Sequence, residues 1–70
     1  MITWKKIDDK EYESEDERFY IINMFDRNYG FCWKMLDKKD LNHILSYHED
    51  SLISCQNKAE SIIEKEDWSV

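Results

Sequence analysis

The chain has 70 residues, 41% of them hydrophobic and 14% aromatic, with one glycine, no proline and a net charge of -6 at pH 7. This length predicts a single domain over residues 1–70, and a composition rich in rings but poor in glycine and proline excludes a disordered protein. Two cysteines are too few for a secreted disulfide framework, and we find neither a signal peptide nor an apolar run near the ~20 residues of a membrane span. We therefore expect a cytoplasmic protein with reduced thiols and no membrane partner.

The N-terminal part combines a short strand with a highly acidic segment. Residues 2–7 (ITWKKI) are rich in β-formers and predict a strand. The decapeptide DDKEYESEDE comes next at residues 8–17, and its seven acids and one lysine supply the whole net charge of the chain. Because like charges repel and extend a chain, we expect an acidic link here, of which residues 10–14 extend a strand at a sheet edge.

A β-hairpin is the strongest signal in the sequence. Alternating residues over 18–25 (RFYIINMF) and 31–36 (FCWKML) predict two strands with apolar side chains on both faces, as in central strands. The connection 26–30 (DRNYG) is a turn sequence whose glycine suits a left-handed backbone. Phe25 shares a face with Phe19, and we expect the rings of the hairpin to lie in the core.

Residues 41–47 (LNHILSY) fit two structures. They alternate like a short fourth strand, which their weak helix formers favour, and Ser46 with Glu49 would then cap the next helix. Their apolar spacing also continues into residues 48–66, so one long helix over 41–66 is the alternative. An apolar stripe at helical spacing predicts the last helix itself at residues 50–66.

These elements predict an α+β fold in which a small antiparallel sheet of three to four strands packs against one C-terminal helix. The alternative is three strands followed by the long helix 41–66. Trp68, beyond the helix, is expected to fold back onto the sheet.

Neither catalysis nor metal binding is indicated. The set Cys32, His43, His48 and Cys55 lacks the close cysteine pair of zinc modules, so we expect no metal and no other cofactor. Cys55 falls on the apolar helix stripe, where an inert buried thiol is expected. Direct nucleic-acid binding is not expected either, because it needs a basic groove and acids outnumber bases. We predict that the protein is not an enzyme.

The acidic decapeptide and the helix end are the candidate binding surface. Glu64, Glu66 and Asp67 oppose the helix dipole, and such a breach of a local rule marks a candidate functional site. Tyr12, inside the acids, would add contact area at low entropic cost, and Tyr29 and Trp68 are further aromatic candidates. The predicted partner-binding residues are Asp8, Asp9, Glu11, Tyr12, Glu13, Glu15, Asp16, Glu17, Glu60, Glu64 and Asp67. The competing interpretation is a solvated acidic linker without a partner.

The stretches FYIINMFDRNYGFCWKML and HILSYHEDSLISCQNKAESIIEK resemble small acidic phage-type proteins that pair an aromatic hairpin with a short strand and a helix. Some proteins of this type are anti-defence or anti-CRISPR inhibitors. The resemblance implies a stoichiometric inhibitor or adaptor that binds a basic, nucleic-acid-handling host protein and occludes its nucleic-acid site. The alternative is a small self-associating module, a homodimer formed through the apolar sheet face that one helix leaves uncovered.

Overall fold

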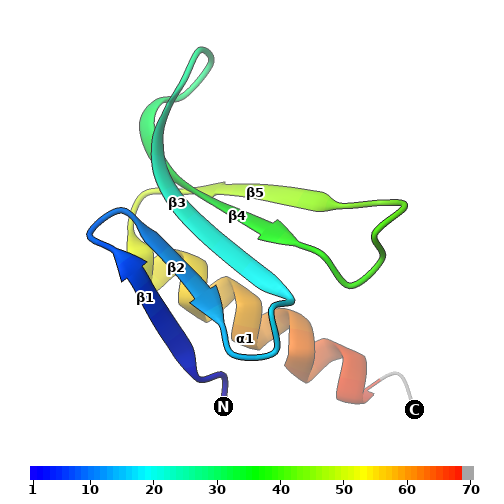
Figure 1. Ribbon diagram of the computed structural model, residues 1–70. Coiled ribbons are helices and arrows are strands. Elements are labelled where there is room, and N and C mark those ends of the chain that lie inside the picture. Colours follow the sequence, from blue (N-terminus) through cyan, green and yellow to red (C-terminus); the bar gives the residue numbers. More distant parts are fainter. Residues whose placement is uncertain (69–70) are drawn as a thin grey trace.

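A computed structural model describes residues 1–68, which form a five-stranded antiparallel sheet with one helix across one face (Figure 1). The elements are β1 (Trp4–Asp8), β2 (Glu11–Ser14), β3 (Phe19–Asp26), β4 (Gly30–Asp37), β5 (Leu45–Glu49) and α1 (Leu52–Trp68). The strands lie in chain order, so β1 and β5 are the two edges. The predicted α+β class is confirmed, with one strand more than expected. Within residues 1–68, no helix is both long and apolar enough to cross a membrane.

The additional strand comes from the acidic decapeptide. Asp8 ends β1, and its carboxylate accepts a hydrogen bond from the backbone N–H of Lys10 at 2.7 Å, which closes the turn to β2. Glu13 of β2 lies opposite Lys5 and also pairs with Lys38 at 3.2 Å, so lysines offset part of the repulsion among the acids. The strand predicted over residues 10–14 is confirmed as β2, whereas an extended acidic link is not formed. The predicted edge position is wrong too, because β2 lies between β1 and β3.

The central hairpin matches its prediction. β3 and β4 pair along their whole length, from Phe19 opposite Asp37 to Asp26 opposite Gly30. Gly30 has a φ of 75°, the left-handed conformation expected for the only glycine. The Asp26 carboxylate accepts the backbone N–H of Asn28 at 2.7 Å and thereby orders the turn.

The segment before the helix is a strand. β5 pairs with β4 in continuous register, and Tyr47 lies opposite Met35 at the core, so the long helix over 41–66 is not formed. Ser46 and Glu49 belong to this strand, and the predicted capping box is wrong. Ser51 caps α1 instead, because its Oγ accepts the N–H of Ser54 at 3.1 Å.

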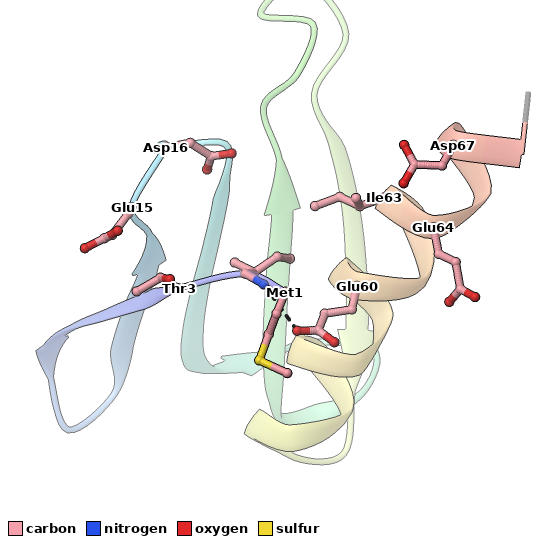
Figure 2. Close-up of a pocket in the computed structure, with 9 residues that line it drawn as sticks. Met1, Thr3, Glu15, Asp16, Glu60, Ile63, Glu64 and Asp67 are labelled. Atoms are coloured by element: carbon pink, nitrogen blue, oxygen red, sulfur yellow. Dashed lines mark hydrogen bonds between the residues drawn. The ribbon is translucent and has the colours of Figure 1, made fainter. Parts of the chain in front are cut away.

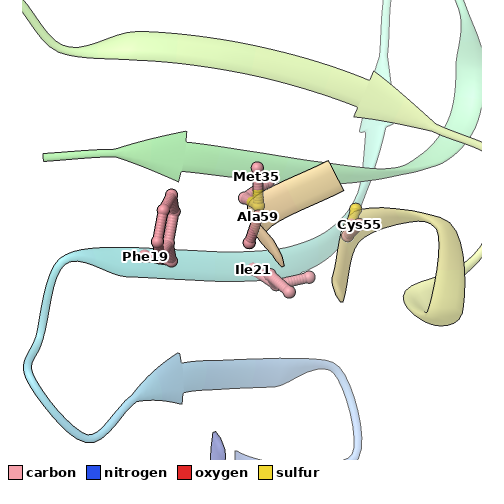
Figure 3. Packing of buried hydrophobic residues seen from close by; sticks show 5 residues of the cluster. All are labelled: Phe19, Ile21, Met35, Cys55 and Ala59. Carbon is pink, nitrogen blue, oxygen red and sulfur yellow. The ribbon is translucent and has the colours of Figure 1, made fainter. Parts of the chain in front are cut away.

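The core lies between α1 and the sheet. Figure 3 shows Phe19 and Ile21 of β3 and Met35 of β4 facing Cys55 and Ala59 of α1, and all five are fully buried. Cys55 and Ala59 are four residues apart on one helical face, and their small side chains let the helix approach the sheet closely. Partly buried hydrophobic residues surround this centre: Ile2, Trp4, Tyr12, Trp33, Tyr47, Leu52, Ile62 and Ile63.

The helix is longer than predicted at its C-terminal end. Trp68 is its last residue, and its side chain is 71% exposed. The ring therefore does not fold back onto the sheet, because the continuing helix carries it away from the core.

Candidate functional site

The turn after β2 and the last turns of α1 border a groove of about 460 Å³ (Figure 2). We call this the acidic groove. Its lining residues are Met1, Ile2, Thr3, Glu15, Asp16, Glu60, Ile63, Glu64 and Asp67. Five of these nine side chains are carboxylates, two from the turn and three from one face of the helix. The fold thus brings together two groups of acids that lie far apart in the sequence.

The turn side of the acidic groove is ordered by the buried hydroxyl of Ser14. Ser14 Oγ donates to Asp16 Oδ1 at 2.6 Å and accepts the N–H of Phe19 at 2.9 Å. The Ser14 hydroxyl, followed by the N–H of Arg18, lowers the pKa of Asp16. Glu17 completes the turn with a φ of 65°, which is unfavourable for a residue other than glycine. Asp16 therefore stabilises the turn, while Glu15 beside it is exposed.

The helix side is held in place by Arg18, the residue directly after the acidic turn. Its guanidinium donates to both carboxylate oxygens of Asp37, at 2.9 and 3.1 Å, and to both of Glu66, at 2.8 Å each. Lys39 Nζ also donates to Glu66 at 2.9 Å. Hydrogen bonds from Arg18 and then Lys39 lower the pKa of Glu66 to about 2. This cluster, which we call the Arg18 clamp, fixes the end of α1 beside the turn.

The Arg18 clamp also changes the interpretation of the acids at the helix end. Glu66 opposes the helix dipole but has two cationic partners, so it needs no external partner. Glu64 and Asp67 are exposed in the acidic groove, and neither forms an ion pair within residues 1–68. They are the helix-end acids left for a partner.

The N-terminal segment connects the two sides of the acidic groove. The N–H of Ile2 donates to Glu60 Oε1 at 3.3 Å, and the carbonyl of Thr3 accepts the N–H of Glu15 at 2.9 Å. Figure 2 shows this segment between the turn and the helix. Met1, Ile2 and Ile63 give the groove an apolar part next to its carboxylates.

The remaining predicted acids lie outside the acidic groove. Asp8 ends β1, and Asp9 lies in the β1–β2 turn, where it pairs with Lys6 at 3.2 Å. Glu11 and Glu13 lie on the sheet face opposite the helix, and Glu17 is exposed at the turn. The eleven predicted residues therefore do not form one surface.

Tyr12 does not project among the acids. It alternates with Glu11 and Glu13 along β2 and so lies on the helix side of the sheet. Its ring centroid is 6.3 Å from that of Trp33, and it packs against the core. Tyr12 thus supports the fold rather than the acidic surface.

The sheet face away from the helix is mixed in character. Apolar and aromatic side chains on it, all half-buried, are Tyr20, Ile22, Met24 and Leu36. Charged residues interrupt them, since Lys38 lies 5.9 Å from the ring centroid of Tyr20 and pairs with Glu13. This face is no continuous apolar surface.

Aromatic side chains at the hairpin tip form a second exposed surface, which we call the aromatic tip: Phe25, Tyr29 and Phe31. Phe25 and Phe31 are 61% and 82% exposed and meet edge to face at 5.2 Å, while Tyr29 stacks on His48 at 4.7 Å. Alternation places Phe25 on the face of Phe19, but the hairpin projects past α1 (Figure 1). The predicted core position is therefore wrong for Phe25 and Phe31, whereas Tyr29, which is also a predicted aromatic candidate for binding, is 66% exposed.

The cysteines and histidines do not come together. Within residues 1–68 no group of three or more His, Cys, Asp or Glu side chains has the arrangement of a metal site. Burial raises the pKa of the Cys55 thiol to about 12, which makes it a poor nucleophile. His43 is exposed in the connection before β5, and His48 Nε2 lies 3.3 Å from the Asp26 carboxylate.

No protein-family model, curated protein or solved structure matches the chain. The resemblance to small phage-type inhibitors therefore stays a prediction. The function has to be inferred from the acidic groove and the aromatic tip.

Proposed function

We propose that the protein is a non-enzymatic inhibitor or adaptor of the small phage type, acting in the host cytoplasm. Its acidic groove would bind a basic segment of a nucleic-acid-handling host protein and occlude the nucleic-acid site there. One observation carries the proposal: the turn acids Glu15 and Asp16 and the helix acids Glu60, Glu64 and Asp67 surround one groove (Figure 2).

The lining of the acidic groove suits arginine and lysine side chains. Their aliphatic stems would pack on Ile2 and Ile63, while the charged heads reach the carboxylates at the rim. An arginine guanidinium would bind most strongly, because it makes two parallel hydrogen bonds with one carboxylate. Residues that bind phosphates in the host protein are of this kind, so a partner bound here would lose contacts that it needs for nucleic acid.

The charge distribution also affects how fast a partner is found. Attraction between opposite charges raises association rates, up to about 10⁸–10⁹ M⁻¹s⁻¹ at low salt. The same attraction is screened beyond about 8 Å at physiological ionic strength. We therefore expect affinity for the host protein to fall steeply with salt.

The experiment compares two variants with the same change in charge. The groove variant carries Glu15→Gln, Glu64→Gln and Asp67→Asn, and the control variant carries Asp9→Asn, Glu17→Gln and Asp50→Asn, all at exposed positions. Each immobilised protein is incubated with nuclease-treated bacterial lysate at about 50 mM and about 500 mM salt, and bound proteins are identified by mass spectrometry.

We expect the wild type and the control variant to retain basic nucleic-acid-binding proteins at low salt only, and the groove variant to lose them. Equal capture by all three proteins would show that the acidic groove is not the binding site. Capture that survives high salt unchanged would contradict electrostatic docking.

The alternative function is self-association through the sheet face away from the helix. The charged residues that interrupt this face, Lys38 and Glu13 among them, make it less suitable than an open apolar face would be. The groove variant should leave such an assembly intact but should lose the host protein. The wild type and the groove variant therefore distinguish the two functions.

A further inference from the structure

The two edges of the sheet differ in how well they are protected against pairing with a strand of another molecule. The β1 edge carries Lys5, Lys6 and Asp8, and its register is interrupted between Lys6 and Asp8. Charged residues and bulges of this kind prevent pairing with another sheet. β5 (LSYHE) has no lysine, no proline and a continuous register with β4. Within residues 1–68, no strand pairs with its outer side.

Exposed apolar side chains lie at both ends of β5. Leu41, Ile44 and Leu45 come at or before its start and are 77%, 47% and 43% exposed. Ile53 comes after its end, in the first turn of α1, and is 67% exposed. Leu41 and Leu45 border a hollow with Ile62 of α1, so they lie on the helix side of the sheet. An edge strand without lysine, proline or a bulge thus has apolar groups at each end.

The geometry points to a second copy of this chain as the occupant of the β5 edge, paired antiparallel across a two-fold axis. Such a pair places the start of one β5 beside the end of the other. Leu41 and Ile44 of one protomer would then approach Ile53 of its partner, and the contact would occur twice. The apolar groups at the two ends complement each other in this arrangement, whereas a single copy leaves them all in water.

The charge distribution favours this edge over the other. The net charge of -6 comes from residues 8–17, which run from the last residue of β1 through β2 to the acidic turn, so two copies that met at β1 would bring these acidic segments together. Residues 27–53, which contain β5 and its flanking apolar side chains, have four basic and four acidic residues. Two copies can therefore meet at β5 without net repulsion between the paired parts.

The interface is small. A five-residue edge strand with four apolar side chains offers less than the roughly 800 Å² per partner of a standard stable interface. We therefore expect a weak dimer, with a dissociation constant of about 10–100 µM. Added salt should leave the dimer unchanged or strengthen it, because it screens the repulsion between two anionic chains.

Sedimentation equilibrium from about 5 µM to about 1 mM tests this proposal, because that range spans the expected dissociation constant. We expect the mass to rise from 8.6 kDa towards twice that value. Ile44→Lys and Ile53→Lys should each weaken the dimer at least about tenfold, because each buries a charge in the interface. Ile7→Lys is the matched control, since Ile7 is 53% exposed on the β1 edge. Far-UV circular dichroism checks that every variant is folded.

Four results would overturn the proposal. The first is a mass that stays at 8.6 kDa up to about 1 mM. The second is a dimer that Ile7→Lys dissociates as strongly as Ile44→Lys does. The third is a dimer weakened by Met24→Lys but not by Ile44→Lys, which would place the contact on the outer sheet face. The fourth is a mass that grows without limit, which indicates head-to-tail pairing of β5 with β1. The groove variant should dimerise like the wild type, so this test does not depend on the proposed function.

Discussion

Arg18 Nη2 lies 2.8 Å from Glu66 Oε2, and this contact joins the end of the acidic turn to the last turns of the helix. The same guanidinium pairs with Asp37, whose side chain is only 7% exposed. Three parts of the molecule thus meet at one cation: the turn after β2, the end of β4 and the C-terminal part of α1. The shape of the acidic groove depends on this contact.

We expect Arg18→Ala to be the most destabilising charge substitution in the chain. It leaves Asp37 buried without its cation, and removing one partner of a buried ion pair costs about 3 kcal/mol or more. For a domain of this size, such a loss lowers the melting temperature by about 12 °C or more. Thermal unfolding followed by circular dichroism measures it. Arg27→Ala in the exposed hairpin turn is the control, with an expected change within about 0.5 kcal/mol. Equal melting of the two variants would contradict the role of the Arg18 clamp.

The Arg18 clamp also predicts how stability depends on pH. The pKa of Glu66 is about 2 in the fold against an ordinary 4.5, so the unfolded chain binds more protons over this range. The contribution of Glu66 is therefore fully present above about pH 4.5 and is lost as the pH falls towards about 2. Urea unfolding at a series of pH values should show wild-type stability falling over this window.

Glu66→Gln is the variant that isolates this effect. It removes the titrating group, so we expect lower stability than wild type near pH 7 and a smaller loss between about pH 5 and pH 2. Asp16 and Asp26 also have lowered pKa values, and they would leave part of the acid sensitivity in the variant. Parallel profiles of stability against pH for wild type and Glu66→Gln would show that the contacts of Glu66 with Arg18 and Lys39 do not stabilise the fold.

The elements that the sequence predicts well are those whose signal is local. Alternation along residues 18–36 and the single glycine at position 30 determine the β3–β4 hairpin, and both lie within one stretch of chain. The inner position of β2 is not predicted, because the partners of this strand are distant in sequence. Glu13 pairs with Lys5 and Lys38, and neither contact is visible from the acidic decapeptide itself. Composition alone therefore overestimates the repulsion within β2.

The candidate site also combines residues that local patterns predict with an arrangement that depends on contacts distant in sequence. The common face of Glu60, Glu64 and Asp67 is a consequence of helical spacing, and the structure places all three in the acidic groove. Their position beside Glu15 depends on how α1 docks, which no local pattern encodes. The exposure of Phe31 is not predicted for a related reason: β3 and β4 have eight residues each and extend beyond the helix. Only a comparison of strand length with helix position would have indicated it.

Glu17 and Gly30 form a matched pair for testing backbone strain. Both have positive φ, at 65° and 75°, but only the glycine adopts this conformation freely. We expect Glu17→Gly to stabilise the fold by about 0.5–1 kcal/mol and Gly30→Ala to destabilise it by about 1 kcal/mol. A Cβ at position 30 would meet no atom within 4 Å, so the second effect comes from the backbone alone. Glu17→Gln separates the loss of charge from the relief of strain. If Glu17→Gly is no more stable than Glu17→Gln in urea, the turn is not strained.

We expect substitution in the aromatic tip to weaken binding of a partner without lowering the stability of the fold. The Phe31 side chain is 82% exposed, so Phe31→Ser removes little buried area, and we expect a change in unfolding free energy within about 0.5 kcal/mol. Phe19, on the same sheet face, is fully buried, and Phe19→Ala should cost about 3–5 kcal/mol.

An exposed pair of phenylalanines held edge to face loses little entropy when a partner binds, as in interface hot spots. We therefore expect Phe31→Ser to reduce retention of the captured host protein at low salt, although it changes neither the net charge nor the acidic groove. Unchanged retention would make the aromatic tip irrelevant to the partner, and a large loss of stability would show that Phe31 supports the fold after all.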